Sequence, residues 1–192
     1  KSIAKMLWKK FRLEFPDILW PKGITLRTQW TAAATVKWFQ IRENDGRREV
    51  FDPIRKKYVA LTPEEEVRQL TMHHLVTEKL MPPGLMAVEH SFKLNGLSKR
   101  TDLTVFAPDA SPLMIVECKA KHVQLNQGVF DQIVRYNMSL QVKFLLVTNG
   151  LSIFFLEVNP LTSEIRFLFN IPTYSQLLQI SGKLWIHQYF IQ

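Results

Sequence analysis

The chain has 192 residues, 46% of them hydrophobic, which is enough to bury one core, and no apolar run approaches the roughly 18–20 residues of a membrane span. Its single cysteine, Cys118, excludes an internal disulfide and fits a reducing cytoplasm, so we expect a cytoplasmic protein. The net charge of +8 is uneven: residues 1–40 carry eight Lys and Arg against two Asp and Glu, whereas residues 41–192 carry 17 against 15, so charge is weak evidence for nucleic-acid binding by the larger part.

Residues 1–38 differ from the rest of the chain and are expected to form an N-terminal extension. Four of the five tryptophans lie here, and Lys9, Lys10 and Arg12 interrupt the segment that a secretory signal would keep apolar. Residues 2–15 have the apolar spacing of a basic amphipathic helix. This helix either packs loosely outside the domain or binds a partner or a membrane surface.

From residue 39 onward the apolar pattern becomes regular. In chain order it predicts a hairpin across Asp45-Gly46, a helix over residues 63–80, strands over 85–93, 100–106 and 113–119, a helix over 126–140, strands over 142–148, 151–158 and 165–169, and a short helix over 174–180. This order predicts a single α/β domain over residues 39–177, with a central mixed β-sheet flanked by helices, followed by a tail over residues 178–192.

The first of these helices has a clear start. Thr62 suits the N-cap, Pro63 the first helical position, and Glu65 would complete a capping box. The helix is expected to turn inward the side chains of Val67, Leu70, His74 and Leu75. Arg68 and Gln69 are expected on its solvated face unless they contact a substrate.

Two carboxylates and a lysine come together on the strands over residues 100–106 and 113–119. If Phe106 faces Leu113 across the turn, then Asp102 faces Glu117, with Cβ atoms roughly 4.5–5.5 Å apart. Because side chains alternate along a strand, Lys119 shares this face. The opposite face is apolar and should be buried; it consists of Leu103, Val105, Met114, Val116 and Cys118.

Opposed like charges are destabilising unless a cation lies between them. A pair of carboxylates suits Mg²⁺, which prefers oxygen ligands and keeps several waters. Such an ion can polarise a phosphoryl oxygen, and Lys119 can orient water or stabilise charge on the phosphate. The alternative is that Glu117 and Lys119 form only a weak surface ion pair.

Further residues strengthen the catalytic interpretation, although each has an ordinary explanation. Gln132 and Tyr136 lie one helical turn apart and share a face that would carry polar groups toward this site. Glu65 would reach it if its helix packs beside the hairpin, although capping explains Glu65 equally well. The basic run Arg55-Lys56-Lys57 would hold a phosphate backbone or would simply be solvated.

Other potentially reactive residues give no site. His73 and His74 point apart on a helix and make a poor metal site. Cys118 should face the core, which argues against a nucleophilic thiol. The chain also lacks a phosphate-binding Gly-x-x-x-x-Gly-Lys-Ser/Thr loop.

Five motifs in order carry a family resemblance. They are Pro63-Glu64-Glu65-Glu66-Val67-Arg68-Gln69, Lys99-Arg100-Thr101-Asp102, Ile115-Val116-Glu117-Cys118-Lys119, Gln132-Ile133-Val134-Arg135-Tyr136-Asn137 and Val147-Thr148-Asn149-Gly150. Over residues 39–177 the chain resembles the N-terminal nuclease domain of the type I restriction enzyme R subunit in a stand-alone form, a branch of the PD-(D/E)xK nuclease superfamily.

The resemblance implies Mg²⁺-dependent DNA cleavage, with Mn²⁺ able to substitute. It implies Asp102, Glu117 and Glu65 as metal ligands and Lys119 as the catalytic lysine. By the same resemblance, the catalytic set also includes Gln132 and Tyr136, and DNA-binding residues are Arg68, Gln69 and Arg100. Thr101 stands where the family usually has proline.

Complete R subunits continue into translocase domains, and this chain ends before them. Restriction-modification or helicase subunits are therefore expected partners, beside DNA. An endonuclease is favoured over an exonuclease, and a symmetric dimer would supply the two sites that a double-strand cut needs. The open alternatives are RNA as substrate and a non-catalytic nucleic-acid-binding or assembly module that keeps the nuclease fold.

Overall fold

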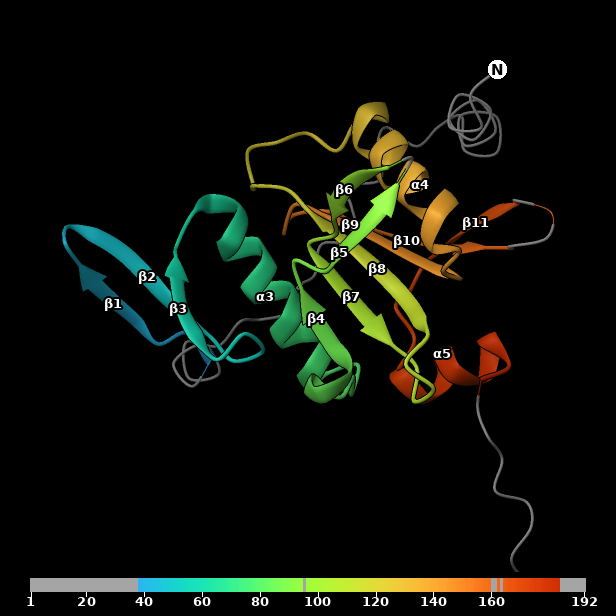
Figure 1. Cartoon of the computed structure of the whole chain (residues 1–192), viewed down its shortest axis with the longest axis horizontal. Coiled ribbons are helices and arrows are strands. Elements are labelled where there is room, and N and C mark those ends of the chain that lie inside the picture. Colours follow the sequence, from blue (N-terminus) through green and yellow to red (C-terminus); the bar gives the residue numbers. More distant parts are fainter. Residues whose placement is uncertain (1–37, 95, 160–161, 163, 184–192) are drawn as a thin grey trace, which may run out of the picture.

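The computed structural model describes residues 38–94, 96–159, 162 and 164–183. Its central feature is a six-stranded sheet in the order β11-β10-β9-β8-β7-β4, with helices on both faces (Figure 1). The strands are β4 (Met86–Val88), β7 (Leu103–Phe106), β8 (Pro112–Cys118), β9 (Phe144–Thr148), β10 (Ile153–Val158) and β11 (Ile165–Leu168), and the helices are α3 (Pro63–Thr77), α4 (Gln127–Leu140) and α5 (Tyr174–Ser181). Residues 1–37 of the predicted extension and residues 184–192 of the predicted tail lie outside the described residues, whereas the start of that tail continues helix α5.

The sheet is mixed, as predicted. Strands β8 and β9 pair in parallel, while every other neighbouring pair of this sheet is antiparallel. Parallel neighbours need a crossover, and α4 supplies it between β8 and β9. The predicted α/β architecture with a mixed sheet and flanking helices is therefore confirmed.

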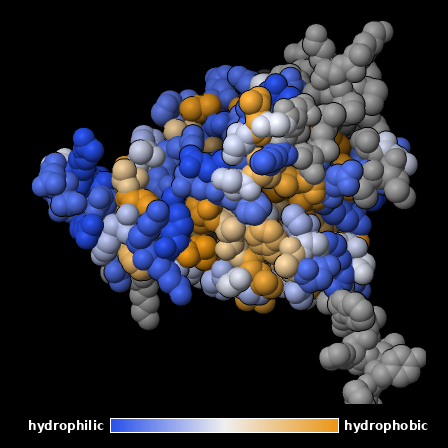
Figure 2. All heavy atoms as spheres, in the orientation of Figure 1, coloured by the Kyte–Doolittle hydropathy of each residue, from blue (hydrophilic) through white to orange (hydrophobic). Residues whose placement is uncertain are grey.

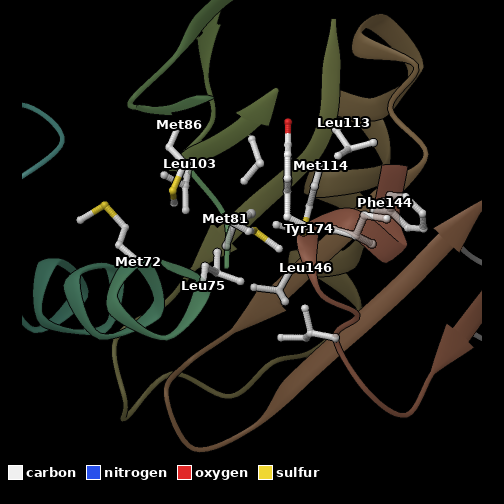
Figure 3. Close-up of a cluster of buried hydrophobic side chains, with 14 of the residues drawn as sticks. Met72, Leu75, Met81, Met86, Leu103, Leu113, Met114, Phe144, Leu146 and Tyr174 are labelled. Atoms are coloured by element: carbon white, nitrogen blue, oxygen red, sulfur yellow. The ribbon is translucent and has the colours of Figure 1, made fainter. Parts of the chain in front are cut away.

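Two apolar layers cover the two faces of the sheet. Leu75 of α3 and Tyr174 of α5 pack with Met114 and Leu146 on one face, where Figure 3 shows the side chains converging. On the other face, α4 packs against a second cluster that includes Ile115. The predicted apolar face of the motif strands lies in the first layer, since Leu103, Val105, Met114, Val116 and Cys118 are all buried there.

A separate three-stranded sheet precedes α3. It consists of β1 (Ile41–Asn44), β2 (Arg47–Asp52) and β3 (Lys57–Ala60). The predicted hairpin is confirmed: Asn44 pairs with Arg47, and Asp45 and Gly46 both have positive φ, as a two-residue hairpin turn requires. Figure 1 shows this sheet beside α3 and projecting from the body, and Figure 2 shows that its projecting end is hydrophilic.

Helix α3 begins as predicted, but the capping box does not form. The Thr62 hydroxyl accepts the backbone N–H of Glu65, whereas the Thr62 N–H donates to the Ala60 carbonyl. The helix also ends at Thr77 rather than near residue 80, because Leu80 takes a left-handed conformation and the Met81 N–H bonds back to the Leu75 carbonyl. Val67, His74 and Leu75 are buried as expected, and Leu70 is partly buried.

Two predicted strands are each divided in the structure. The predicted strand over residues 85–93 breaks at Glu89, whose φ is 56°, into β4 and β5 (Ser91–Leu94). The predicted strand over residues 100–106 becomes β6 (Leu97–Arg100) and β7, and β5 and β6 form a small sheet of their own. A short 3₁₀ helix, Pro83–Leu85, precedes β4. No helix in the described part of the chain is both long and apolar enough to cross a membrane.

Candidate functional site

Asp102 and Glu117 come together at one end of the β7–β8 pair. Leu103 pairs with Val116, so the adjacent positions, Asp102 and Glu117, face each other as predicted. A β-bulge after Val105 shifts the register at the turn, where Phe106 pairs with Pro112 instead of the expected Leu113. The register prediction is therefore correct at the carboxylates and wrong at the turn.

The Glu117 carboxylate is buried and satisfied by two donors. Its Oε1 atom accepts from Lys119 Nζ at 2.7 Å and from Gln132 Nε2, on α4, at 2.5 Å. Burial first, and then the charge of Asp102, raise the pKa of Glu117 to about 7. With this pKa, Glu117 is partly protonated near neutral pH, and Lys119 opposes the shift.

Lys119 follows the last residue of β8, and its backbone N–H donates to the Thr148 carbonyl at 2.8 Å. Burial alone would lower the pKa of Lys119, but the hydrogen bond to Glu117 and the charges of Glu117 and Asp102 raise it. The ammonium group therefore stays protonated and contributes a fixed positive charge beside Glu117.

Asp102 is held from two sides. Its Oδ2 atom accepts the backbone N–H of Cys118 at 2.7 Å, and its Oδ1 atom accepts from Arg68 at 2.9 Å. Burial alone would lower the pKa of Arg68, but Asp102 and Glu65 raise it. Arg68 and Gln69 are both buried, so the expectation of a solvated helix face is wrong: acidic partners pull these polar groups inward.

Glu65 lies at the centre of this acidic and basic cluster. Its Oε2 atom accepts from Arg68, and its Oε1 atom accepts from Gln69 at 2.8 Å and from Arg55 at 2.6 Å. These donors explain why the Glu65 side chain does not cap α3. Arg68 lies between Glu65 and Asp102, contacting both carboxylates.

Asp52 and Glu89 were not predicted as members of the cluster. Asp52 is fully buried and pairs with Arg55 at 2.6 Å, and Glu89 pairs with the same guanidinium at 3.0 Å. Asp52 precedes Pro53, which signals a turn but not a site. The sequence contains no signal for Glu89, because its role depends on the break between β4 and β5.

A family model described as the type I restriction enzyme R protein N terminus matches residues 63–172, which is more than half of the chain. The chain belongs to the type I restriction enzyme R protein N-terminal family. The matched residues include Asp102, Glu117 and Lys119, whereas sheet β1–β3 precedes them.

One similar solved structure is a fragment of a protein described as an HsdR subunit of a type I restriction enzyme from Vibrio vulnificus YJ016. It is 25% identical, with a TM-score of 0.47, over 64% of this chain and 26% of that one. The chain thus spans about a quarter of that protein's fragment. The comparison with curated proteins gives no match.

The other predicted residues of this R-family domain are placed as follows. Arg100 is exposed at the edge of the cluster and pairs with Glu89 at 3.1 Å. The basic run was expected either to hold a phosphate backbone or to be solvated; Arg55 is instead surrounded by carboxylates, whereas Lys56 and Lys57 are exposed. Tyr136 lies on α4 one turn after Gln132, and its side chain lies outside the described residues.

The donor set of this R-family domain fits a hard cation. Within the described residues no group of three or more His, Cys, Asp or Glu side chains is arranged to hold a metal ion. Mg²⁺ does not need one, because it binds through one or two carboxylates together with waters and substrate phosphates. Asp102 and Glu117 supply such a pair, and the charge of Asp102, after burial, raises the pKa of Glu117.

Burial is the main influence on the pKa of each residue that the sequence predicts to be outside the chemistry. Cys118 is fully buried on the opposite side of β8, and burial raises the pKa of its thiol. Burial also lowers the pKa of His73 and of His74, and His74 lies 3.3 Å from Glu78 rather than at the cluster.

Proposed function

We propose that the chain hydrolyses phosphodiester bonds of DNA in a divalent-metal-dependent reaction, as an endonuclease of the restriction or repair type. The observation that carries this proposal is the facing pair of half-buried Asp102 and buried Glu117, with Lys119 on the same face. Membership of the type I restriction R family supports it. A pure binding module would not need two opposed carboxylates, because they repel a phosphate backbone.

Asp102 and Glu117 would hold Mg²⁺, or Mn²⁺ in its place. When bound, such an ion neutralises charge on a phosphoryl oxygen and lowers the pKa of water. Glu65 is a less direct ligand candidate than these two, because its oxygens accept from three donors, Arg55, Arg68 and Gln69, whereas the described contacts give Asp102 and Glu117 two donors each. In this proposal Glu65 contributes chiefly by holding Arg68 against Asp102.

Lys119 supplies positive charge in this reaction. Because its pKa is raised, it does not accept a proton near neutral pH, and it acts by orienting water and stabilising the negative charge that develops on the phosphate. Gln132 fixes the Glu117 carboxylate through the contact with Oε1. Tyr136, one turn after Gln132 on α4, is proposed to belong to the same catalytic set.

The wider setting is also a proposal. We expect DNA as the substrate, restriction-modification or helicase subunits as partners, a cytoplasmic location, and a dimer where both strands are cut. The second candidate function is a non-catalytic nucleic-acid-binding or assembly module. It is favoured by one observation: Lys119 and Gln132 already satisfy Glu117 without any metal.

The deciding experiment is cleavage of labelled single- and double-stranded DNA with Mg²⁺, with Mn²⁺ and with EDTA. Lys119→Ala should lower the rate by about 10²–10³-fold, while DNA binding and the fold persist. Lys121→Ala is the matched control, because Lys121 lies two residues further on, is exposed and pairs with Glu66. Cleavage by Lys119→Ala at the wild-type rate would refute the assigned mechanism, and no cleavage by folded wild type would favour the binding module.

A further inference from the structure

The turn that follows β2 contacts the acidic residues of the candidate site through the side chain of Arg55. This residue follows β2, and its guanidinium contacts Asp52 through Nε at 2.6 Å, Glu65 through one terminal nitrogen at 2.6 Å and Glu89 through the other at 3.0 Å. The side chain is 13% exposed. Each of the three guanidinium nitrogens therefore donates to a carboxylate within the protein.

The Arg55 backbone is also fixed. The Oδ1 atom of Asp52 accepts the backbone N–H groups of Ile54 and Arg55, both at 2.8 Å. The Oδ2 atom accepts from Gln69 of α3 at 3.1 Å in addition to Arg55. Asp52 thus fastens the turn after β2 to helix α3 and sets the direction in which Arg55 extends.

The contacts continue from Arg55 to the proposed metal ligand. Arg55 donates to Glu65, Arg68 donates to both Glu65 and Asp102, and the other oxygen of Asp102 accepts from Cys118. The charges alternate along this series, so each group orients the next. The planar guanidinium directs its nitrogens at several carboxylates in a fixed geometry, which the single ammonium group of a lysine cannot do.

We propose that Arg55 is a positioning residue for the site: it holds Glu65 so that Arg68 keeps the Asp102 carboxylate in its metal-binding orientation. The effect on metal binding rests on the proposed function; the positioning of Asp102 does not. Sheet β1–β3, which precedes the residues matched by the family model, is then a required part of the site.

The direction of the effect follows from competition for Arg68. Without Arg55, the Oε1 atom of Glu65 would keep only the neutral amide of Gln69. Glu65 would then attract Arg68 more strongly, and Asp102 would lose part of its contact with the guanidinium. Asp102 would be less well oriented, although no residue that touches it directly had been changed.

The test compares Arg55→Lys and Arg55→Gln with Arg42→Gln. Arg42 lies on β1 of the same sheet, but it is exposed and pairs with Glu49 at 2.7 Å, so it controls for loss of an arginine there. Two quantities are measured on folded protein: the Kd for Mn²⁺ by calorimetry, and the Arg68 guanidinium signals by NMR in metal-free buffer. Loss of an outer partner of a metal ligand typically weakens metal binding about 10–100-fold.

We expect both Arg55 variants to weaken Mn²⁺ binding by this factor and to change the Arg68 signals, with Arg42→Gln matching wild type. A folded Arg55→Lys that keeps the wild-type Kd and Arg68 signals would overturn the proposal. If Arg55→Gln does not fold, the result for Arg55→Lys decides. If neither variant folds, the double variant Asp52→Asn with Arg55→Gln is measured in the same way, because it removes both charges of the Asp52–Arg55 pair.

A wild-type protein that binds no Mn²⁺ would refute the proposed metal-dependent function instead. In that case changed Arg68 signals in the Arg55 variants still support the positioning of Asp102, and unchanged signals overturn it. The two failures are therefore distinguishable.

Discussion

The Asp102 carboxylate accepts the backbone N–H of Cys118 at 2.7 Å. This bond ties the residue before β7 to the last residue of β8 and holds Asp102 beside Glu117. The bond is charge-assisted, and such bonds are about twice as strong as neutral ones. The same contact keeps two negative charges close together, and the raised pKa of Glu117 is partly the consequence.

Asp102→Asn should lower the pKa of Glu117 from about 7, because it removes the charge that is second only to burial in raising that pKa. Cleavage should also be lost. The measurement is an NMR titration of the Glu117 carboxyl carbon. Glu64→Gln is the control, since Glu64 is a weaker contributor to the same pKa, and it should lower that pKa less. An unchanged pKa in Asp102→Asn would contradict the coupling.

Glu117→Gln should change how stability depends on pH in metal-free buffer. Because the pKa of Glu117 is about 7 in the folded protein and near 4.5 when unfolded, its stabilising contribution is fully present below pH 4.5 and is lost as pH rises through 7. The shift corresponds to about 3 kcal/mol. Relative to wild type, the variant should therefore become more stable as pH rises: the difference in free energy of unfolding, variant minus wild type, should increase by about this amount between pH 4.5 and 8.

Urea unfolding in EDTA at several pH values measures this difference. Other carboxylates titrate mainly below this pH range. Their contributions to stability are common to the two proteins, so they cancel when the variant is compared with wild type at each pH. Parallel curves for the two proteins would mean that Glu117 titrates in the folded state as it does in the unfolded chain.

Gln132→Leu should slow cleavage about 10–100-fold, as is typical for loss of a partner that orients a metal ligand. The reason is that Glu117 Oε1 would keep Lys119 as its only described donor and lose the restraint from α4. Arg135→Ala is the control on the same helix, because Arg135 is exposed and bonds only to the Asp131 carbonyl among the contacts described. Equal rates in the two variants would remove Gln132 from the proposed machinery.

Gly150→Ala should destabilise the protein more than Gly46→Ala does. Both glycines have positive φ, of 79° and 72°, so both variants carry the backbone strain of a side chain in the left-handed region. Only at Gly150 would the added Cβ meet a neighbour, lying 3.3 Å from a methyl of Val67, which is fully buried. Each variant should cost on the order of 1 kcal/mol or more in strain, and Gly150→Ala should add a packing cost.

Thermal or urea unfolding of the two glycine variants side by side checks this prediction. If the two variants lose the same free energy of unfolding, then the loop after β9 moves to accommodate the added Cβ without a packing cost. The close approach of Gly150 to α3 would then contribute nothing to the docking of that helix.

Much of the fold could be predicted because its signals are local. Thr62 and Pro63 start α3, Asn126 caps α4, and Asp45-Gly46 turns the first hairpin. Alternation along β8 correctly places Cys118 on the apolar face, opposite to Glu117. In each case the residues that decide the structure lie within a few positions of one another, so no knowledge of distant contacts is needed.

The wrong predictions concern residues whose partners lie far away in the sequence. Glu65 was expected to cap α3 and Arg68 to be solvated, and both expectations fail because each residue pairs with a group brought in by another element. The break at Glu89 likewise accompanies ion pairs with Arg55 and Arg100. A pattern of neighbours along the chain contains no information about such partners.

The sequence by itself determined the helices, most of the strands, the mixed sheet and the facing pair Asp102 and Glu117, because periodicity and turn chemistry act over short separations. Only the tertiary structure decided which charges meet. Arg68 and Asp102 are 34 residues apart in the chain, as are Arg55 and Glu89. Their contacts exist only once β2, α3 and β7 have packed, because an ion pair depends on distance in space and not on separation in sequence.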